Sequence, residues 1–243
     1  MRVFQRLFAA LSLSLMAATA GASPDRPANG VEYRTLDKAQ STDAGKKVEV
    51  TEFFWYSCPH CNAFDPMLSE WVKKQGGNIV FKRVPVAFRD TFAPQQRLYY
   101  TIEALGKTEE LHKKIFNAIH AQNTPLATDA EIIDFMVKQG IDKQKFLELF
   151  NSFGVQTKAR RATQLQGDYK VDGVPLVAVD GRYMTSPSIV GNTLGKKTSE
   201  AEQQAAALRV MDALVMKAGN EHKLHTADAK PAGVKSGAET QKK

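Results

Sequence analysis

Segments with the hydrophobic pattern of strands alternate along this chain with segments whose apolar residues recur at helical spacing. Apolar and aromatic residues dominate Val48–Trp55, and residues 78–86 alternate with many β-branched side chains, so both segments predict buried strands. Between them the apolar residues recur at helical spacing. Pro59 fits the first turn of such a helix, because its missing amide proton has no intrahelical partner there. A helix beginning at or just after Cys58 therefore joins the two strands in a right-handed crossover.

Helical periodicity continues from about residue 93 to residue 166. Thr128 with Glu131 predicts a capping box at the start of one helix in this region. We expect four consecutive helices that form a subdomain inserted between two strands, with three apolar stripes as its core. The stripes consist of Leu111, Ile115, Phe116 and Ile119, then Ile132, Ile133, Met136 and Val137, and finally Phe146, Leu149, Phe150 and Phe153.

Strand signals return later in the chain. Val174–Val179 predicts a strand, residues 180–181 a tight turn, and Arg182–Thr185 the second arm of a hairpin. Ser199 and Glu202 then predict the capped start of a last amphipathic helix.

The first residues have the pattern of an export signal. Arg2 and Arg6 precede an apolar run shorter than the roughly 20 residues needed to span a bilayer, and small residues follow, so we expect cleavage after Ala22. The predicted organisation is a signal at residues 1–22, a polar arm at 23–46 with a short edge strand at Val31–Leu36, a folded domain at 47–218 and a disordered polar tail at 219–243.

Charge adds little about partners. Removal of residues 1–22 takes away two of the 33 basic residues and none of the 26 acidic ones, which leaves a net charge of +5. The basic residues are dispersed in small clusters such as Arg160 with Arg161, and aromatic residues do not interleave with them as on a single-strand nucleic-acid platform. We interpret them as solvated helix faces and expect no nucleic-acid partner.

The candidate chemistry lies at the end of the first strand. Cys58 and Cys61 are the only cysteines of the chain, and Pro59 and His60 separate them. A bridge between residues so close in sequence closes too short a loop to be a useful structural staple. At the amino end of a helix, backbone amides and the helix dipole favour the thiolate of Cys58, and His60 adds a donor or a positive charge. This combination is typical of thiol-disulfide exchange.

Four features together carry a resemblance to a known family. They are Glu52–Phe54 before the cysteines, the Cys58–Cys61 tetrad, the inserted helical block and Gly173–Pro175 at the entry to a late strand. Over roughly residues 31–217 the chain resembles the DsbA family of thiol:disulfide oxidoreductases in the thioredoxin superfamily. The resemblance implies an α/β thioredoxin-like fold with an inserted helical subdomain.

The resemblance also implies roles for individual residues. Cys58 would be the sulfur attacked by substrate thiolates, and Cys61, less exposed, would close the intramolecular disulfide. A cis Val174–Pro175 bond would lie beside them, with the Val174 backbone pairing with an extended substrate. An ordinary trans proline at a strand entrance remains an alternative.

Glu52 would lie beneath the cysteines and assist proton transfer, with Lys82 on the neighbouring strand as its partner. A carboxylate in an apolar strand needs such pairing, because burying a lone charge is costly. A plain salt bridge at a strand edge is the alternative.

Activity, partners and location follow from the same resemblance. We expect an enzyme that donates its Cys58–Cys61 disulfide to unfolded exported proteins with free thiols, and that a membrane quinone reductase of the DsbB type reoxidises. The protein would be a periplasmic monomer without a cofactor or metal beyond its own redox-active disulfide.

The remaining titratable residues show no catalytic spacing. We interpret the other histidines as surface or capping residues, and several acids as solvated helix faces. These histidines are His112, His120, His222 and His225, and the acids are Asp65, Glu70, Glu109 and Glu110.

Four other functions remain open at this stage. A zinc module would need a second pair of cysteine or histidine ligands and would copurify with zinc. A folding chaperone would keep its activity in a Cys58→Ser variant. A disulfide isomerase would need a dimerisation module, for which the polar arm is too short, whereas a reductase would differ only in its redox equilibrium with glutathione.

Overall fold

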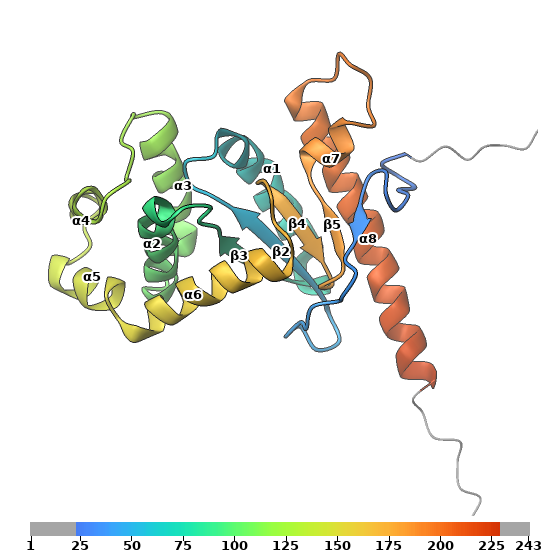
Figure 1. The fold of residues 1–243 in the computed structure, drawn as a ribbon, viewed down its shortest axis with the longest axis horizontal. Helices are drawn as coiled ribbons and strands as arrows, with labels where there is room; N and C mark the ends of the chain where they lie inside the picture. The colour runs from blue at the N-terminus through green and yellow to red at the C-terminus, as the bar shows by residue number, and fades with distance from the viewer. Residues whose placement is uncertain (1–22, 229–243) are drawn as a thin grey trace, which may run out of the picture.

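A five-stranded mixed sheet forms the centre of the protein in the computed structural model, which describes residues 23–228 (Figure 1). The strand order is β1-β5-β4-β2-β3. The bounds are Arg34–Thr35 for β1, Val48–Phe54 for β2, Ile79–Pro85 for β3, Leu176–Val179 for β4 and Tyr183–Thr185 for β5. Only β2 and β3 pair in parallel, through the crossover helix α1, Pro59–Gln75. The strand, helix and strand predicted around the cysteines are confirmed.

The sheet packs against two apolar cores. One joins β2 and β4 to α1 and to the C-terminal helix α8, Glu200–Asp228, through side chains such as Val50, Leu68 and Met211. The other joins the sheet to the helical subdomain through residues such as Phe54 and Phe116. Every residue of β2 is buried, as expected of a central strand covered on both faces.

The helical subdomain contains five helices between β3 and β4, where we expected four. Their bounds are Ala93–Ala104 for α2, Thr108–His120 for α3, Asp129–Lys138 for α4, Lys143–Phe150 for α5 and Phe153–Asp168 for α6. The predicted third stripe spans two helices, because Ser152 caps the amide of Val155 and starts α6. Phe153 is consequently 81% exposed rather than part of the core. The capping box of Thr128 and Glu131 is confirmed at the start of α4.

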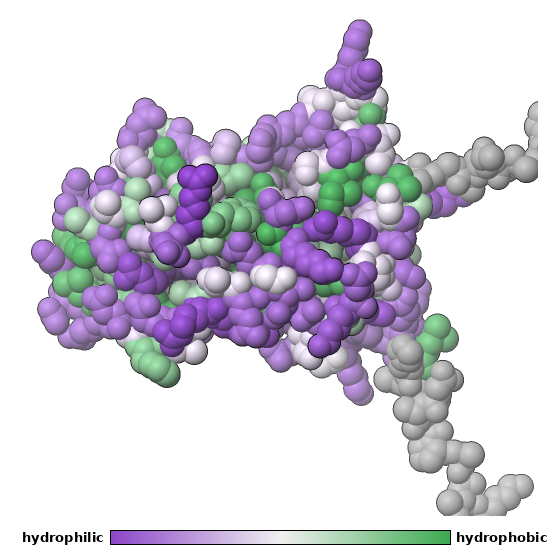
Figure 2. All heavy atoms as spheres, in the orientation of Figure 1, coloured by the Kyte–Doolittle hydropathy of each residue, from purple (hydrophilic) through white to green (hydrophobic). Residues whose placement is uncertain are grey.

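The face seen in Figure 2 is largely hydrophilic along α6. Lys158, Arg160 and Arg161 of this helix are exposed, which agrees with their interpretation as a solvated helix face.

The C-terminal region follows the hairpin of β4 and β5. A short helix α7, Pro187–Gly191, precedes α8, whose first turn carries the expected capping box of Ser199 and Glu202. The prediction of a disordered tail is wrong for residues 219–228, which continue α8. Glu221 fastens this part of the helix to the hairpin by accepting hydrogen bonds from Arg182 and Tyr183.

Two predictions concern segments outside the described residues: the export signal at residues 1–22 and the last part of the tail, residues 229–243. Within residues 23–228, no helix combines the length and the apolar character needed to cross a membrane. The predicted edge strand is shorter than expected, since β1 covers only Arg34–Thr35 of Val31–Leu36 and pairs with β5.

Candidate active site

The two cysteines lie where β2 turns into α1. Cys58 is the N-cap residue of α1, with extended backbone angles, and Pro59 occupies the first helical position. The carbonyl of Cys58 accepts the first intrahelical bond from the amide of Asn62. Cys61 lies inside the first turn, so both sulfurs share the helix end where unpaired amides favour negative charge.

The two thiols differ strongly. Both are free, Cys58 is 7% exposed and Cys61 is fully buried. The hydrogen bond from the Cys61 thiol lowers the pKa of Cys58 to about 6 against the opposing effect of burial, and backbone amides and the charge of His60 add to this. Burial and the nearby Cys58 sulfur instead raise the pKa of Cys61 well above its usual value. The pair therefore ionises at one sulfur only.

His60 pairs with a residue far away in the sequence. Its Nδ1 lies 2.7 Å from Oε1 of Glu200, in the first turn of α8, and this hydrogen bond raises the pKa of His60. Sequence reasoning missed Glu200, because nothing in the chain indicates that the start of α8 reaches the cysteine loop. The capping box at Ser199 was the only nearby signal.

The peptide bond between Val174 and Pro175 is cis, as the resemblance implies. The Cys58 thiol donates to the carbonyl oxygen of Val174 at 3.4 Å, so the strand entrance directly flanks the reactive sulfur. A small cleft of about 170 Å³ opens beside it, between His60, Val174 and Pro175 on one side and α7 and α8 on the other.

Glu52 is buried in β2 and pairs with Arg83, not with Lys82. The Nε of Arg83 donates to Oε2 of Glu52 at 2.9 Å. Burial raises the pKa of Glu52 to about 7, with the charge of Arg83 opposing this shift.

The predicted Lys82 partner is wrong because of strand register. In the parallel pair, Glu52 lies opposite Arg83 and Thr51 opposite Lys82, so Lys82 points to the other face of the sheet. There its Nζ lies 2.7 Å from Oε2 of Glu49.

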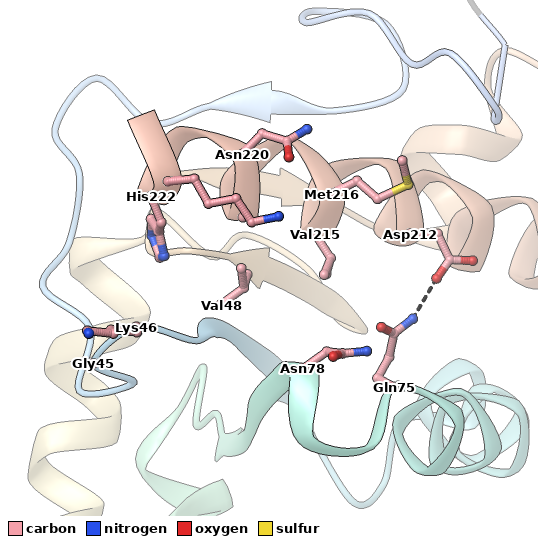
Figure 3. Close-up of a pocket in the computed structure, with 12 residues that line it drawn as sticks. Gly45, Lys46, Val48, Gln75, Asn78, Asp212, Val215, Met216, Asn220 and His222 are labelled. Atoms are coloured by element: carbon pink, nitrogen blue, oxygen red, sulfur yellow. Dashed lines mark hydrogen bonds between the residues drawn. The ribbon is translucent and has the colours of Figure 1, made fainter. Parts of the chain in front are cut away.

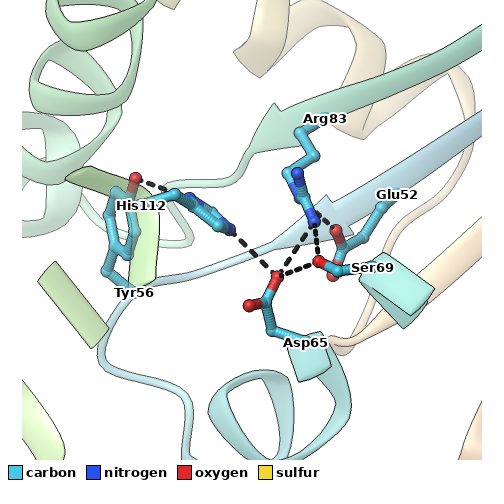
Figure 4. Close-up of polar contacts among 6 residues, drawn as sticks. All are labelled: Glu52, Tyr56, Asp65, Ser69, Arg83 and His112. Atoms are coloured by element: carbon cyan, nitrogen blue, oxygen red, sulfur yellow. Dashed lines mark hydrogen bonds and ion pairs between the residues drawn. The ribbon is translucent and has the colours of Figure 1, made fainter. Parts of the chain in front are cut away.

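Two other predictions are wrong at the same place. Asp65 and His112, interpreted as surface residues, are both buried and contact each other, with Nε2 of His112 3.3 Å from Oδ1 of Asp65 (Figure 4). Arg83 donates to the same oxygen of Asp65 at 2.9 Å. The sequence pattern does not indicate that Asp65 and His112 are buried, because tertiary packing decides which faces of their helices are covered.

The remaining residues of that group lie outside the site. Glu70, Glu109 and Glu110 are exposed, as expected. His222 pairs with Asp180, and His120 lies 2.8 Å from the carbonyl of Tyr56.

A cavity of about 860 Å³ lies far from the cysteines (Figure 3). It is lined by Val48 at the start of β2, Gln75 at the end of α1 and residues of α8. A helix of this length places Gln75 roughly 25 Å from the amino end of α1. In the described part of the chain, no group of three or more potential ligands could hold a metal ion.

The chain is similar to known proteins over most of its length. A DSBA-like thioredoxin domain model matches residues 49–201. A thiol:disulfide interchange protein DsbA from Burkholderia cepacia is 49% identical over 186 residues, which cover 76% of this chain and 88% of the relative. The DsbA protein from Pseudomonas aeruginosa is 36% identical over 177 residues, covering 73% of this chain and 83% of that protein.

Solved structures agree with the sequence comparison. The crystal structure of Pseudomonas aeruginosa DsbA superposes with a TM-score of 0.71 at 32% identity, over 80% of this chain and 95% of that one. The oxidoreductase DsbA from Xylella fastidiosa gives a TM-score of 0.69 at 28% identity, over 79% and 97% of the two chains. With its strand order, its cis proline and its paired cysteines, the chain belongs to the family of DSBA-like thioredoxin domains.

Proposed function

We propose that this chain is a thiol:disulfide oxidoreductase that donates a Cys58–Cys61 disulfide to other proteins. Its curated relatives are thiol:disulfide interchange proteins. The observation that carries the proposal is the asymmetry of the two thiols, with the pKa of Cys58 lowered to about 6 and that of Cys61 raised.

The asymmetry favours donation of the disulfide. The ordinary thiol pKa of 9.0 and the value of about 6 for Cys58 differ by about 3, which corresponds to about 4 kcal/mol of preference for the thiolate. This preference stabilises the reduced form relative to the oxidised form. Reduction of the disulfide is therefore favourable, and the oxidised protein is a strong oxidant.

The reaction has two exchange steps. A substrate thiolate attacks the Sγ of Cys58, forming a mixed disulfide while the Cys58–Cys61 bond breaks and its electron pair passes to Cys61. A second substrate thiolate then attacks the substrate sulfur of the mixed disulfide, and Cys58 leaves as a stable thiolate. Two electrons have passed from the substrate thiols to the cysteine pair.

Glu52 supplies a proton in the first step. The high pKa of Cys61 makes its thiolate a poor leaving group unless it is protonated. Glu52, with a pKa of about 7, is partly protonated near neutral pH, and its charge is close enough to raise the pKa of Cys61. Arg83, rather than Lys82, holds its carboxylate.

Substrates bind along the entrance to β4. The backbone of Val174 pairs with an extended substrate segment next to Cys58, and Pro175 shapes this edge together with the cleft lined by His60. Such backbone pairing tolerates many side chains, which suits an enzyme that oxidises unrelated proteins.

The biological setting follows from the export pattern and the family. The protein acts in the periplasm as a monomer on newly exported proteins with free thiols, and a DsbB-type membrane quinone reductase restores its disulfide. The cysteine pair is its only redox group, without a metal or a nucleic-acid partner.

Trapping the mixed disulfide tests the assignment of Cys58. A Cys61→Ser variant whose Cys58 is first converted to a mixed disulfide with Ellman's reagent should exchange the thionitrobenzoate for the single thiol of an unfolded protein, and it should retain this covalent adduct because no neighbouring thiol can displace it. Non-reducing gel electrophoresis with mass spectrometry identifies the adduct, and Cys58→Ser is the matched control. Adducts in the control variant alone would assign the attacked sulfur to Cys61.

A further inference from the structure

A buried chain of polar contacts leads from Glu52 into the helical subdomain (Figure 4). Arg83 binds Glu52 through its Nε and Asp65 through its NH2, each at 2.9 Å. Nε2 of His112 lies 3.3 Å from Oδ1 of Asp65, and Nδ1 of His112 lies 2.8 Å from the hydroxyl of Tyr56. Only the first of these contacts takes part in the reaction described above.

The hydrogen bonds define the state of His112. The Asp65 carboxylate can only accept a hydrogen bond, so it selects the tautomer of the neutral ring that has its proton on Nε2. Nδ1 then accepts a hydrogen bond from the hydroxyl of Tyr56, whose pKa burial raises well above its usual value. Burial also lowers the pKa of His112, so the ring is a neutral donor to the Asp65 carboxylate.

One guanidinium serves two buried carboxylates. Burial opposes ionisation of Asp65, but the hydrogen bond from His112, together with the charge of Arg83, holds its pKa below its usual value. Glu52 has no donor comparable to His112. Burial, with the negative charge of Asp65 added, therefore raises its pKa. Removing the charge of Asp65 would leave Arg83 entirely to Glu52.

We propose that His112 is a positioning residue for proton exchange between Glu52 and Cys61, because it keeps Asp65 as the ionised partner of Arg83. The inference rests on the proposed role of Glu52 as the proton donor to Cys61. His112 lies on α3, so the inserted subdomain contributes directly to the proton chemistry of the cysteine pair.

Few other titratable side chains surround His112 and Glu52. Besides Tyr56, Asp65 and Arg83, the titratable side chains that face His112 are Tyr99 of α2 and Glu109 of α3. Glu52 additionally faces the two cysteines. A hollow of about 330 Å³, lined by Asp65, Ser69, Arg83 and His112 among others, opens from this cluster toward the surface. This hollow shares no lining residue with the cleft beside Cys58.

Titration of Glu52 tests the inference. Carbon-13 NMR follows its carboxyl group in the reduced protein. In His112→Leu, Asp65 loses a donor and takes up a proton more readily, so Arg83 stabilises the Glu52 carboxylate more fully and the pKa of Glu52 falls by about 1. His112→Gln retains a donor and should keep the value near that of the unchanged protein. Asp65→Asn should show the largest fall.

A second readout links the network to reactivity. The pH profile of the rate at which the reduced pair reacts with oxidised glutathione should shift with the Glu52 pKa in each variant. If His112→Leu does not fold, Tyr56→Phe decides. It removes the hydrogen bond to Nδ1 and so weakens Nε2 as a donor to Asp65, and the pKa of Glu52 should fall as in His112→Leu.

Two results would overturn the inference. Either Glu52 titrates unchanged in His112→Leu and Asp65→Asn, or His112→Gln shifts it as much as His112→Leu, which would show an effect of packing alone. The NMR titration requires no substrate, so it decides the network independently of the mixed-disulfide trap that tests the proposed function.

Discussion

At the scale of single residues, the site depends on one thiol that ionises and one that does not. The positions of Cys58, Cys61 and Pro175 follow from the sequence, because their spacing and flanking residues are local features. The charged partners of Glu52 and His60 do not follow from it. Arg83 and Glu200 are brought to the site by strand register and by the placement of a distant helix, neither of which the local pattern encodes.

His60 should tune the redox equilibrium through its charge. In His60→Leu the Cys58 thiolate loses a nearby positive charge, so its pKa should rise and the disulfide should become less oxidising. Because His60 is exposed, we expect only about a 2- to 10-fold change in the equilibrium constant with glutathione.

The dependence on salt provides the control. A Coulombic effect at an exposed residue should shrink as ionic strength rises, whereas a packing effect should not. An equilibrium constant that is the same in both proteins at low salt would remove His60 from the account.

At the scale of elements, helical and strand periods predicted most of the architecture. Both central strands, the start of α1 and the hairpin lie within one or two residues of the predicted positions. The errors arose where tertiary contacts override local preference. Ser152 splits one predicted helix into two. Helix α8 continues beyond the predicted end of the domain, where Glu221 contacts the β4–β5 hairpin.

The last turns of α8 should contribute to stability but not to redox chemistry. Glu221→Ala removes the acceptor for Arg182 and Tyr183, and should lower the free energy of unfolding by about 1 to 2 kcal/mol. Urea denaturation measures this change. Glu70→Ala, an exposed acid on α1, is the matched control and should change the free energy by less than about 0.5 kcal/mol.

If the Glu221→Ala protein were as stable as the control variant, the polar contacts of Glu221 would add nothing to the stability that the apolar packing of α8 provides. An altered equilibrium with glutathione would contradict the separation of this helix end from the site.

At the scale of the whole molecule, the sheet and the helical subdomain meet beneath the cysteines. The sequence resemblance predicted the thioredoxin-like fold with its insertion, and the family comparison confirms it. It did not predict that the insertion supplies His112 to the buried network, because a histidine among apolar helical positions has no signature of its own. The insertion thus supports the site as well as covering the sheet.

Ultraviolet absorbance of the thiolate in the reduced protein tests the central claim most directly, with Cys58→Ser as the blank. The account predicts a single titration step with a pKa of about 6 that disappears in the blank, while Cys61 stays protonated at neutral pH. A step near the ordinary thiol value of 9.0 would contradict it, because the disulfide would then have no charge-based tendency to be donated.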